Sequence, residues 1–474
     1  MGHGLYGLAP EDSRMPWNPR IANETSPLYI AIADAIAADA ENGRLAPGTR
    51  LPTHRALAAT LGVDVTTVSR AYAEAHRRGL VVGHVGRGTY VRGGRSPALV
   101  PAPPALIDLT VNLPPEPSDV CDEAMRQSLA ELAQAPAIAP LLAYAPAGGS
   151  REHREAGRVW CAERGVTATI ERVLVCGGAQ QALAAILSTH CEPGDTVLAE
   201  DLTYPGFLAA ARMLRLRVVG VAIDGDGIIP DDLLRACKAH RPKVVLTTPT
   251  LQNPTAGVMS VGRRRRIASI VRDRGLVVVE DDTYGPLAPN APRPIAAVVP
   301  ELSYYVSSFS KAVSPALRIA FMVAPTSAHA IRVSRHVQAT GWLASPIMTE
   351  VAARWISSGT TTTIVADRRR EAEARQTLLR DSLGLSRNVG SPHALHHWLE
   401  LPRQWERASD FVDTLRRRGV LVTSGDAFAV DATQPVRAVR VSLGAAPSRP
   451  ALATALETIA SLLREDPEPV RPAR

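Results

Sequence analysis

The sequence of 474 residues contains few cysteines, few aromatic residues and no long apolar run. Its five cysteines form no CxxC pair and no cluster with histidine, which excludes a disulfide framework and a standard zinc site. No apolar stretch approaches the roughly 20 residues that a membrane span needs, and the first residues lack the basic patch and apolar core of a secretory signal. We therefore expect a cytoplasmic protein without a bound metal or a membrane partner.

Lysine is also scarce, because the chain has only Lys238, Lys243 and Lys311. Any chemistry that needs a lysine amine therefore has three candidates. The rest of the composition is that of a folded protein, with 46% hydrophobic and 21% charged residues. A chain of this length is expected to form roughly two to four domains.

The positive charge is concentrated near the N-terminus. Residues 44–95 hold nine arginines and two acids, a net of +7, whereas residues 1–43 hold two arginines and six acids, a net of −4. The remaining residues carry +4, which completes the total of +7. A basic segment of this kind indicates a polyanionic partner.

The basic segment has the pattern of a winged helix-turn-helix domain, which we place at residues 21–92. Helical spacing, caps and turn residues predict its three helices, and two β-rich runs around a Gly-Arg-Gly turn predict a hairpin. An extension, residues 1–20, precedes the domain, and a linker rich in Pro and Gly, residues 93–107, follows it. The predicted helices cover residues 27–43, 53–60 and 65–78, and the hairpin lies within residues 80–93.

In such a domain the second helix of the helix-turn-helix enters the major groove of DNA. Its first residues, which face base edges, and the basic residues near the hairpin tip are the expected contacts, and a phosphate is favoured at a helix N-terminus. A small basic domain that binds a protein is the alternative. The candidate DNA-binding residues are Thr53, Arg55, Thr66, Thr67, Ser69, Arg70 and Arg87.

These residues carry a resemblance to the GntR family of winged-helix repressors. The similarity covers about residues 26–92 and rests on PGTRLPTHRALAATLGVDVTTVSRAYAEAHRRGLV followed by GRGTYV. It implies binding to double-stranded DNA. Many members have Ser-Arg where this chain has Asp64–Val65, so that Arg70 or Arg55 has to supply the base contacts.

From residue 108 the pattern changes to short β-branched runs that alternate with helices rich in Ala, Leu and Arg. This alternation predicts an α/β domain, residues 108–465, with a mainly parallel sheet. Its last third, from about residue 330, is expected to form a smaller α+β lobe, and residues 466–474 a disordered tail. Strands are predicted at 173–176, 196–199, 217–223, 244–248, 276–280, 304–308 and 319–324, and helices at 179–190, 205–214, 230–239 and 261–274.

Lys311, in SSFSKAVSPALRIAF, is the best candidate for lysine chemistry. A lysine forms a Schiff base with an aldehyde cofactor, and Ser308, Ser310 and Arg318 suit the phosphate of such a cofactor. Lys238 lies near a predicted helix C-terminus, where a cation complements the helix dipole, and Lys243 starts a strand. A surface lysine is the alternative for Lys311.

Two other segments suit the same cofactor. The strand-turn-helix VLVCGGAQQAL offers main-chain N–H groups of Gly178, Ala179 and Gln180 to a phosphate. In VVVEDDTYG, Asp281 can pair with a protonated pyridine nitrogen, while Tyr284 can donate to the phenolate oxygen of the ring. An ordinary glycine-rich turn and an exposed acidic turn are the structural alternatives.

Further candidates lie at other predicted strand ends and on a late strand. Asn253 can bond the same ring oxygen, and Tyr204 can stack on the ring, although a turn asparagine and a core tyrosine are the alternatives. Arg440 suits a substrate carboxylate as a bidentate clamp, with Arg437 as the competing choice. Several candidates therefore lie where open α/β sheets form their ligand crevice.

Together these motifs resemble fold-type I pyridoxal-phosphate enzymes of the aminotransferase class I/II group, over about residues 108–465. The resemblance implies that Lys311 is the internal aldimine lysine, with Asp281 and Tyr204 as its catalytic neighbours. It also implies that Tyr144 reaches the cofactor phosphate of a neighbouring subunit, and hence a homodimer. The sequence differs from the family pattern at Ala179, where Ser or Thr is usual, at Ala320, where Gly is usual, and in NPTAG, which is one residue longer than NPTG.

A GntR-type module joined to an aminotransferase-like domain resembles the MocR/GabR-type transcription regulators. The resemblance implies a head-to-tail homodimer that senses an amino compound, or pyridoxal 5′-phosphate itself, through the aldimine at Lys311. The alternative is an active aminotransferase that carries a DNA-binding module.

Overall fold

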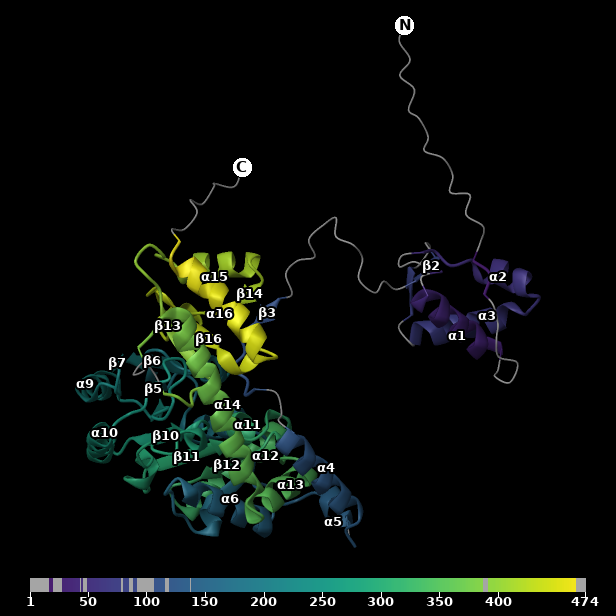
Figure 1. Cartoon of the computed structure of the whole chain (residues 1–474). Coiled ribbons are helices and arrows are strands. Elements are labelled where there is room, and N and C mark those ends of the chain that lie inside the picture. Colours follow the sequence, from purple (N-terminus) through teal and green to yellow (C-terminus); the bar gives the residue numbers. More distant parts are fainter. Residues whose placement is uncertain are drawn as a thin grey trace. The chain divides into compact units, whose positions relative to one another are not determined.

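The computed structural model describes residues 17–19, 28–42, 44–45, 49–77, 80–84, 88–91, 106–115, 119–136, 138–386 and 391–465. The chain divides into two compact units, Met1–Ala102 and Pro103–Arg474 (Figure 1). Arg87, the predicted tail and most of the predicted N-terminal extension and linker lie outside the described residues.

The N-terminal unit is a three-helix domain with a hairpin, as the sequence predicts. Ile32 and Ile36, on the predicted apolar stripe, pack with Leu57, Val68 and Tyr72 in one buried core. The hairpin strands pair antiparallel. The elements are α1 (Leu28–Glu41), α2 (His54–Leu61), α3 (Val65–Arg77), β1 (Val81–His84) and β2 (Gly88–Val91).

The turn between α2 and α3 is fixed by its capping residues. The Thr53 hydroxyl accepts a hydrogen bond from Ala56 N at 3.2 Å and caps the start of α2. Gly62 ends α2 in the left-handed region, at φ 66°. Asp64 then accepts hydrogen bonds from the main-chain N and the hydroxyl of Thr66, at 2.7 and 2.6 Å. The Asp64 that departs from the family pattern therefore stabilises the first turn of α3.

The C-terminal unit is built on a seven-stranded sheet in the order β4-β12-β11-β10-β9-β5-β6. Adjacent strands are parallel except that β12 runs antiparallel to both neighbours. The predicted mainly parallel α/β fold is therefore confirmed. The strands are β4 (Val173–Cys176), β5 (Thr196–Glu200), β6 (Arg217–Val221), β9 (Val244–Thr247), β10 (Val277–Asp281), β11 (Ser303–Ser308) and β12 (Ala320–Val323).

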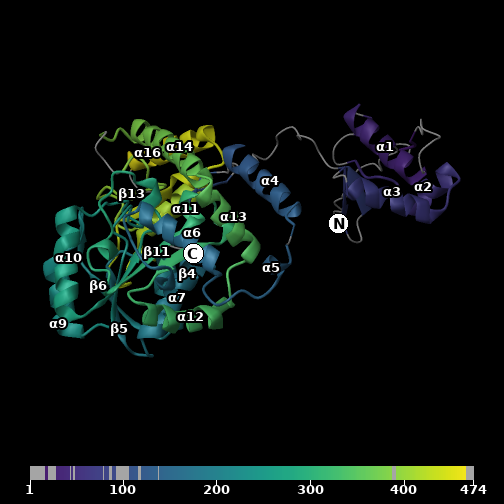
Figure 2. The same cartoon turned by 90° about the horizontal axis from the view of Figure 1, so that it is seen from below.

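Helices cover both faces of this sheet (Figure 2). Leu174 packs in a core with α7, α8 and α12, whereas Val175, the next residue of β4, packs in a core with α6 and α13. A third core, with α9 and α10, lies on the same face of the sheet as the core with α6 and α13 and covers the rest of that face. These helices are α6 (Arg151–Glu163), α7 (Ala179–His190), α8 (Pro205–Met213), α9 (Pro230–His240), α10 (Val261–Arg274), α12 (Ser327–Gly341) and α13 (Pro346–Ser357).

The smaller lobe is shorter than the sequence suggests. Helices α12 and α13 were expected in it, but their apolar residues Val337 and Trp355 belong to the cores of the large sheet. Helix α14 (Thr360–Leu383) spans from one core to the other, because Ile364 packs in the large domain and Leu379 in the small lobe. The lobe itself contains β13 (His396–Glu400), α15 (Ala408–Arg417), β14 (Val420–Leu421), β15 (Thr423–Ser424), β16 (Ala438–Ser442) and α16 (Arg449–Leu463).

The chain enters the C-terminal unit through this small lobe. Strand β3 (Ile107–Asp108) pairs parallel with β14, and Leu109 is buried in the lobe core. The chain then passes to α4 (Asp119–Ala133) and α5 (Ala139–Leu142), and a two-stranded hairpin, β7 (Ile223–Asp224) and β8 (Gly227–Ile228), follows β6.

Among the described residues, no helix is both long and apolar enough to span a bilayer.

Two helical glycines provide a matched test of the packing. A Cβ on Gly157 in α6 would lie 2.3 Å from the Phe321 ring of β12, whereas a Cβ on Gly262 in α10 would meet nothing within 4 Å. We expect Gly157→Ala to lower the free energy of unfolding by about 1–3 kcal/mol through overpacking. Gly262→Ala is expected to leave it unchanged or raise it by up to about 1 kcal/mol. Denaturant unfolding of both variants checks this, and equal effects would contradict the described contact.

Candidate cofactor site and DNA-binding module

A cavity of about 330 Å³ lies at the carboxyl ends of β9 and β10, next to the start of α7. It brings together most of the residues that the sequence proposes for a cofactor, from segments far apart in the chain. The predicted residues that line it are Ala179, Gln180, Tyr204, Asn253, Asp281, Tyr284, Ser310, Lys311, Arg318 and Arg440.

Lys311 lies on the one-turn helix α11 (Phe309–Ala312), directly after β11. Its amine donates a hydrogen bond to the main-chain oxygen of Asn112. Burial lowers the pKa of Lys311 to about 8, and the nearby charges of Arg440 and Arg318 act in the same direction, while Asp281 opposes them. A larger fraction of the amine than in an ordinary lysine is therefore uncharged and nucleophilic near neutral pH.

Asp281 is the last residue of β10 and is buried. Its carboxylate accepts hydrogen bonds from the main-chain N and the hydroxyl of Thr283, at 3.1 and 2.5 Å. Burial nevertheless raises the pKa of Asp281 above its usual value. A cationic partner in the cavity would offset this cost, and a protonated ring nitrogen is such a partner.

The start of α7 is shaped for an anion. Gly178 precedes the helix with φ 104°, and a Cβ there would lie 2.8 Å from the Arg318 guanidinium. Glycine at this position therefore lets Arg318 approach the helix N-terminus, where Ala179 and Gln180 line the cavity. A guanidinium beside unpaired main-chain N–H groups suits a phosphate.

Ser308 is not placed at the cavity wall, in contrast to the expectation. Its side chain is fully buried, accepts from Ser310 N at 3.2 Å and donates to Ile319 O at 3.2 Å. The hydroxyl therefore caps α11, and Ser310 is the serine that lines the cavity.

Arg440, rather than Arg437, faces the cavity. Its guanidinium donates to Asn253 Oδ1 at 2.9 Å and to Thr110 O at 2.6 Å, and its buried Nε has no hydrogen-bond partner among the described residues. Arg437 donates instead to Leu401 O at 3.2 Å. The side chain of Asn253 is thus paired with Arg440 in this structure.

The ring of Tyr204, which also lines the cavity, packs directly on Gly206. A Cβ on Gly206 would lie 2.3 Å from that ring.

Tyr144 lies away from this cavity. Its side chain is 83% exposed, and its ring is 5.4 Å from that of Trp342. Its expected contribution to the site of a second subunit remains a prediction.

Sequence reasoning missed Asn112, which lines the cavity, and His396, which contacts Asn112 without lining the cavity itself. Asn112 Nδ2 lies 2.9 Å from Tyr284 Oη and 2.9 Å from His396 Nδ1, and all three side chains are buried. The three are separated by up to 284 residues in sequence. No local motif marks Asn112 or His396, because their proximity arises only when the small lobe packs on the large domain.

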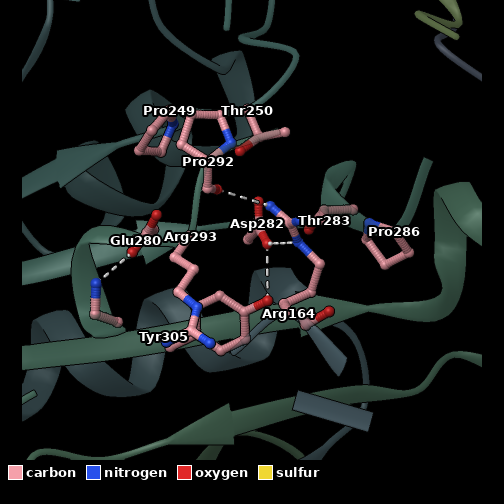
Figure 3. A network of polar contacts seen from close by, with 12 residues as sticks. Arg164, Pro249, Thr250, Glu280, Asp282, Thr283, Pro286, Pro292, Arg293 and Tyr305 are labelled. Atoms are coloured by element: carbon pink, nitrogen blue, oxygen red, sulfur yellow. Dashed lines mark hydrogen bonds and ion pairs between the residues drawn. The ribbon is translucent and has the colours of Figure 1, made fainter. Parts of the chain in front are cut away.

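A second polar network lies behind Asp281. Arg164 and Tyr305 both point at the carboxylate of Asp282, at 3.0 and 2.8 Å (Figure 3). Next to it, Glu280 accepts hydrogen bonds from the main-chain N of Ile295 and Ala296, at 3.1 and 2.8 Å. Because Asp282 is held on this side, the preceding Asp281 is turned to the cavity.

We expect the ion pair between Arg164 and Asp282 to be important for stability. Arg164→Leu leaves the buried Asp282 carboxylate without its cation and should lower the free energy of unfolding by about 3–5 kcal/mol. The control is Arg158→Leu on α6, the helix that ends just before Arg164. The ion pair of Arg158 with Glu155 is partly exposed and should contribute about 0–1 kcal/mol. Chemical denaturation measures the free energy of unfolding of both variants. A loss for Arg164→Leu that is no larger than the loss for Arg158→Leu would refute the stabilising role of the Arg164–Asp282 pair.

The N-terminal unit exposes most of its candidate DNA contacts. Thr53, Arg55 and Arg70 are exposed, and the Arg70 guanidinium lies 4.2 Å from the centre of the Tyr29 ring. The Ser69 hydroxyl is 3.0 Å from His54 Nδ1, which sequence reasoning did not anticipate. Thr66 is exposed and Thr67 is half-buried at the start of α3.

Comparisons with known proteins agree with both units. Residues 104–459 match the family "Aminotransferase class I and II", and residues 28–91 match "Bacterial regulatory proteins, gntR family". The uncharacterized HTH-type transcriptional regulator YdeF of Bacillus subtilis is 31% identical over 91% of this chain and 94% of its own. The vitamin B6 salvage pathway transcriptional repressor PtsJ of Salmonella typhimurium is 29% identical over 87% of this chain and 93% of its own.

A solved structure shows the same fold in the C-terminal unit. It is LysN, an α-aminoadipate aminotransferase of Thermus thermophilus in complex with N-(5′-phosphopyridoxyl)-L-leucine, with a TM-score of 0.66 and 24% identity. The alignment covers 76% of this chain and 92% of LysN. The chain therefore belongs to the aminotransferase class I and II family, in the group of HTH-type transcriptional regulators that carry a gntR-type DNA-binding module in front of the aminotransferase domain.

Proposed function

We propose that this transcription regulator holds pyridoxal 5′-phosphate on Lys311 and senses an amino compound through it. The observation that carries the proposal is the half-buried Lys311, whose amine shares one cavity with Asp281, Arg318 and Arg440. When bound, the cofactor supplies an aldehyde that condenses with amines and a ring that withdraws electrons.

The residues present fit this cofactor along its whole length. Ser310, Arg318 and the N-terminus of α7 (Ala179 and Gln180) would hold the phosphate. The carboxylate of Asp281 would pair with the ring nitrogen. Tyr204 would stack on the ring, and Tyr284 would donate to the ring oxygen. Asn253 would also bond the ring oxygen if Arg440 gave up its hydrogen bond to Asn253 in order to bind a ligand.

Contacts of Lys311 and Arg440 suggest how a ligand is sensed. Both side chains donate to main-chain oxygens of one segment, Lys311 to Asn112 and Arg440 to Thr110. Attachment of the cofactor would engage the Lys311 amine and end the first contact, an amine that replaces Lys311 on the cofactor would release the lysine to Asn112 again, and a carboxylate bound by Arg440 would compete for the second contact. This segment directly follows β3, which continues from the linker, so that a change there is transmitted along the chain toward the DNA-binding unit.

A head-to-tail homodimer on double-stranded DNA in the cytoplasm completes the proposal. Tyr144 and Trp342 form an exposed aromatic pair, and Leu142 beside them is 70% exposed. Apolar side chains of this size at one surface favour burial by a second copy. Tyr144 would then reach the neighbouring cofactor, as the family resemblance implies, and two copies of α3 would read two half-sites.

Catalytic transamination is the second candidate. It is favoured by the placement of Lys311, Asp281 and Arg440, the three residue types that the reaction needs, in one cavity. Repeated turnover with a keto acid distinguishes it from sensing, in which the protein reacts once and stops.

The first prediction concerns the attachment of the cofactor. The purified protein mixed with pyridoxal 5′-phosphate should show a visible absorption band, and Lys311→Ala should abolish it because the amine is lost. Lys243→Ala, which removes an exposed lysine at the start of β9, is the matched control and should retain the band. A band that survives in Lys311→Ala would disprove the assignment.

The second prediction concerns pH. The pKa of Lys311 is lowered to about 8, so that the amine is mostly protonated below this pH and mostly neutral above it. Since only the neutral amine attacks an aldehyde, the rate of cofactor uptake by the apoprotein should rise with pH and level off above about 8. A rate that continues to rise toward about pH 10, as for an ordinary lysine, would contradict the lowered pKa.

The third prediction concerns sensing. Using DNA selected by the loaded protein from a random-sequence library, at least one of a panel of carboxylated amines should change the affinity about fivefold or more. Arg440→Ala should remove the effect, and Arg437→Ala, which alters an exposed arginine near the same strand, should preserve it. Unchanged affinity over a broad panel would rule out sensing of a carboxylated amine.

A further inference from the structure

Three buried side chains, His396, Asn112 and Tyr284, form a chain of hydrogen bonds beside the cavity. His396 Nε2 lies 2.9 Å from the main-chain oxygen of Gln252. Because a carbonyl oxygen only accepts, Nε2 must carry the hydrogen of this bond. Burial lowers the pKa of His396 to about 3, so that the ring is neutral at ordinary pH and its Nδ1 is an acceptor.

This tautomer fixes the amide of Asn112. Only the NH₂ group can face an accepting Nδ1, so Asn112 Nδ2 donates to His396 and, with its second hydrogen, to Tyr284 Oη, both at 2.9 Å. The orientation has a cost, because Asn112 Oδ1 is buried with no partner among the described residues.

The Tyr284 hydroxyl is thereby left with its own hydrogen unused. Its oxygen accepts from Asn112, and among the described residues it donates to no protein acceptor. Tyr284 lines the cavity beside Lys311 and Asp281. Burial raises the pKa of Tyr284 above its usual value, so that the group remains a donor over the whole working range.

We propose that Asn112 and His396 are positioning residues that hold the hydroxyl proton of Tyr284 toward the ring oxygen of bound pyridoxal 5′-phosphate. This inference rests on the proposed function, since it needs the cofactor in the cavity. A hydroxyl donated to the ring oxygen stabilises the anionic form of that oxygen and lowers the pH at which the visible band of the bound cofactor titrates. Among the described residues, the side chains of Asn112 and His396 make no hydrogen bond to the Lys311 amine, and they would act through Tyr284.

The test is the pH midpoint of the visible band in the full-length, cofactor-loaded protein. Asn112→Leu, which is similar in size but cannot donate, should raise the midpoint by about one unit, equivalent to about tenfold in proton affinity. Tyr284→Phe should raise it at least as much, and the double variant should titrate like Tyr284→Phe alone. His396→Leu should also raise it, whereas His396→Asn, whose side-chain oxygen can replace Nδ1 as the acceptor, should remain closer to the unaltered protein.

The matched control is Thr349→Val. Thr349 is a buried residue of α13 that does not line the cavity, and its hydroxyl donates to Ser345 O. Removal of this hydrogen bond should leave the midpoint unchanged. An unshifted midpoint in Asn112→Leu, or shifts that add in the double variant, would overturn the inference while the proposed function stands. Absence of any visible band in the unaltered protein would instead overturn the proposed function. If Asn112→Leu does not fold, the comparison of His396→Leu with His396→Asn decides.

Discussion

The site depends on the environment of one amine. Lys311 is held between the main-chain oxygen of Asn112 and a cavity in which Arg318 and Arg440 are the neighbouring cations. Burial and these charges lower the pKa of the amine, and the buried Asp281 opposes them only in part. In the proposed function, an amine that loses its proton more easily reacts with the aldehyde of the cofactor, and the Asp281 carboxylate pairs with the ring nitrogen.

In the proposed function, the same contacts would connect the cofactor site to regulation. Asn112 and Thr110 belong to the segment between β3 and α4, and this segment is held by one hydrogen bond from Lys311 and one from Arg440. Asn112 in addition bonds Tyr284 and His396. A ligand that displaces these bonds would change the segment on which the small lobe and the large domain meet. The described hydrogen bonds therefore offer a short physical route from cavity to linker, without a requirement for a long relay through the sheet.

Much of this could be predicted from sequence, for reasons that differ among elements. Strands of the large sheet are short, apolar and bounded by turns, so that β4 and helices such as α7 and α10 were predicted at their observed bounds. The lysine window and the acidic strand end are local patterns, and the structure brings both to one cavity. Helices α12 and α13 lie almost entirely in the stretch predicted to form the smaller lobe but pack on the large sheet, because an apolar stripe does not show which core it faces. Ser308 was placed in the phosphate group because sequence shows a hydroxyl but not the direction in which it turns. Asn112 and His396 were missed because their function exists only as a tertiary contact.

The most direct test of the account is chemical identification of the attached residue. The loaded protein is reduced with borohydride, which makes the bond between lysine and cofactor permanent, then digested and examined by mass spectrometry. The chain offers only three lysines. The account predicts the phosphopyridoxyl mass on the peptide that contains Lys311. The same mass on Lys238 or Lys243 alone, or on no lysine, would contradict it.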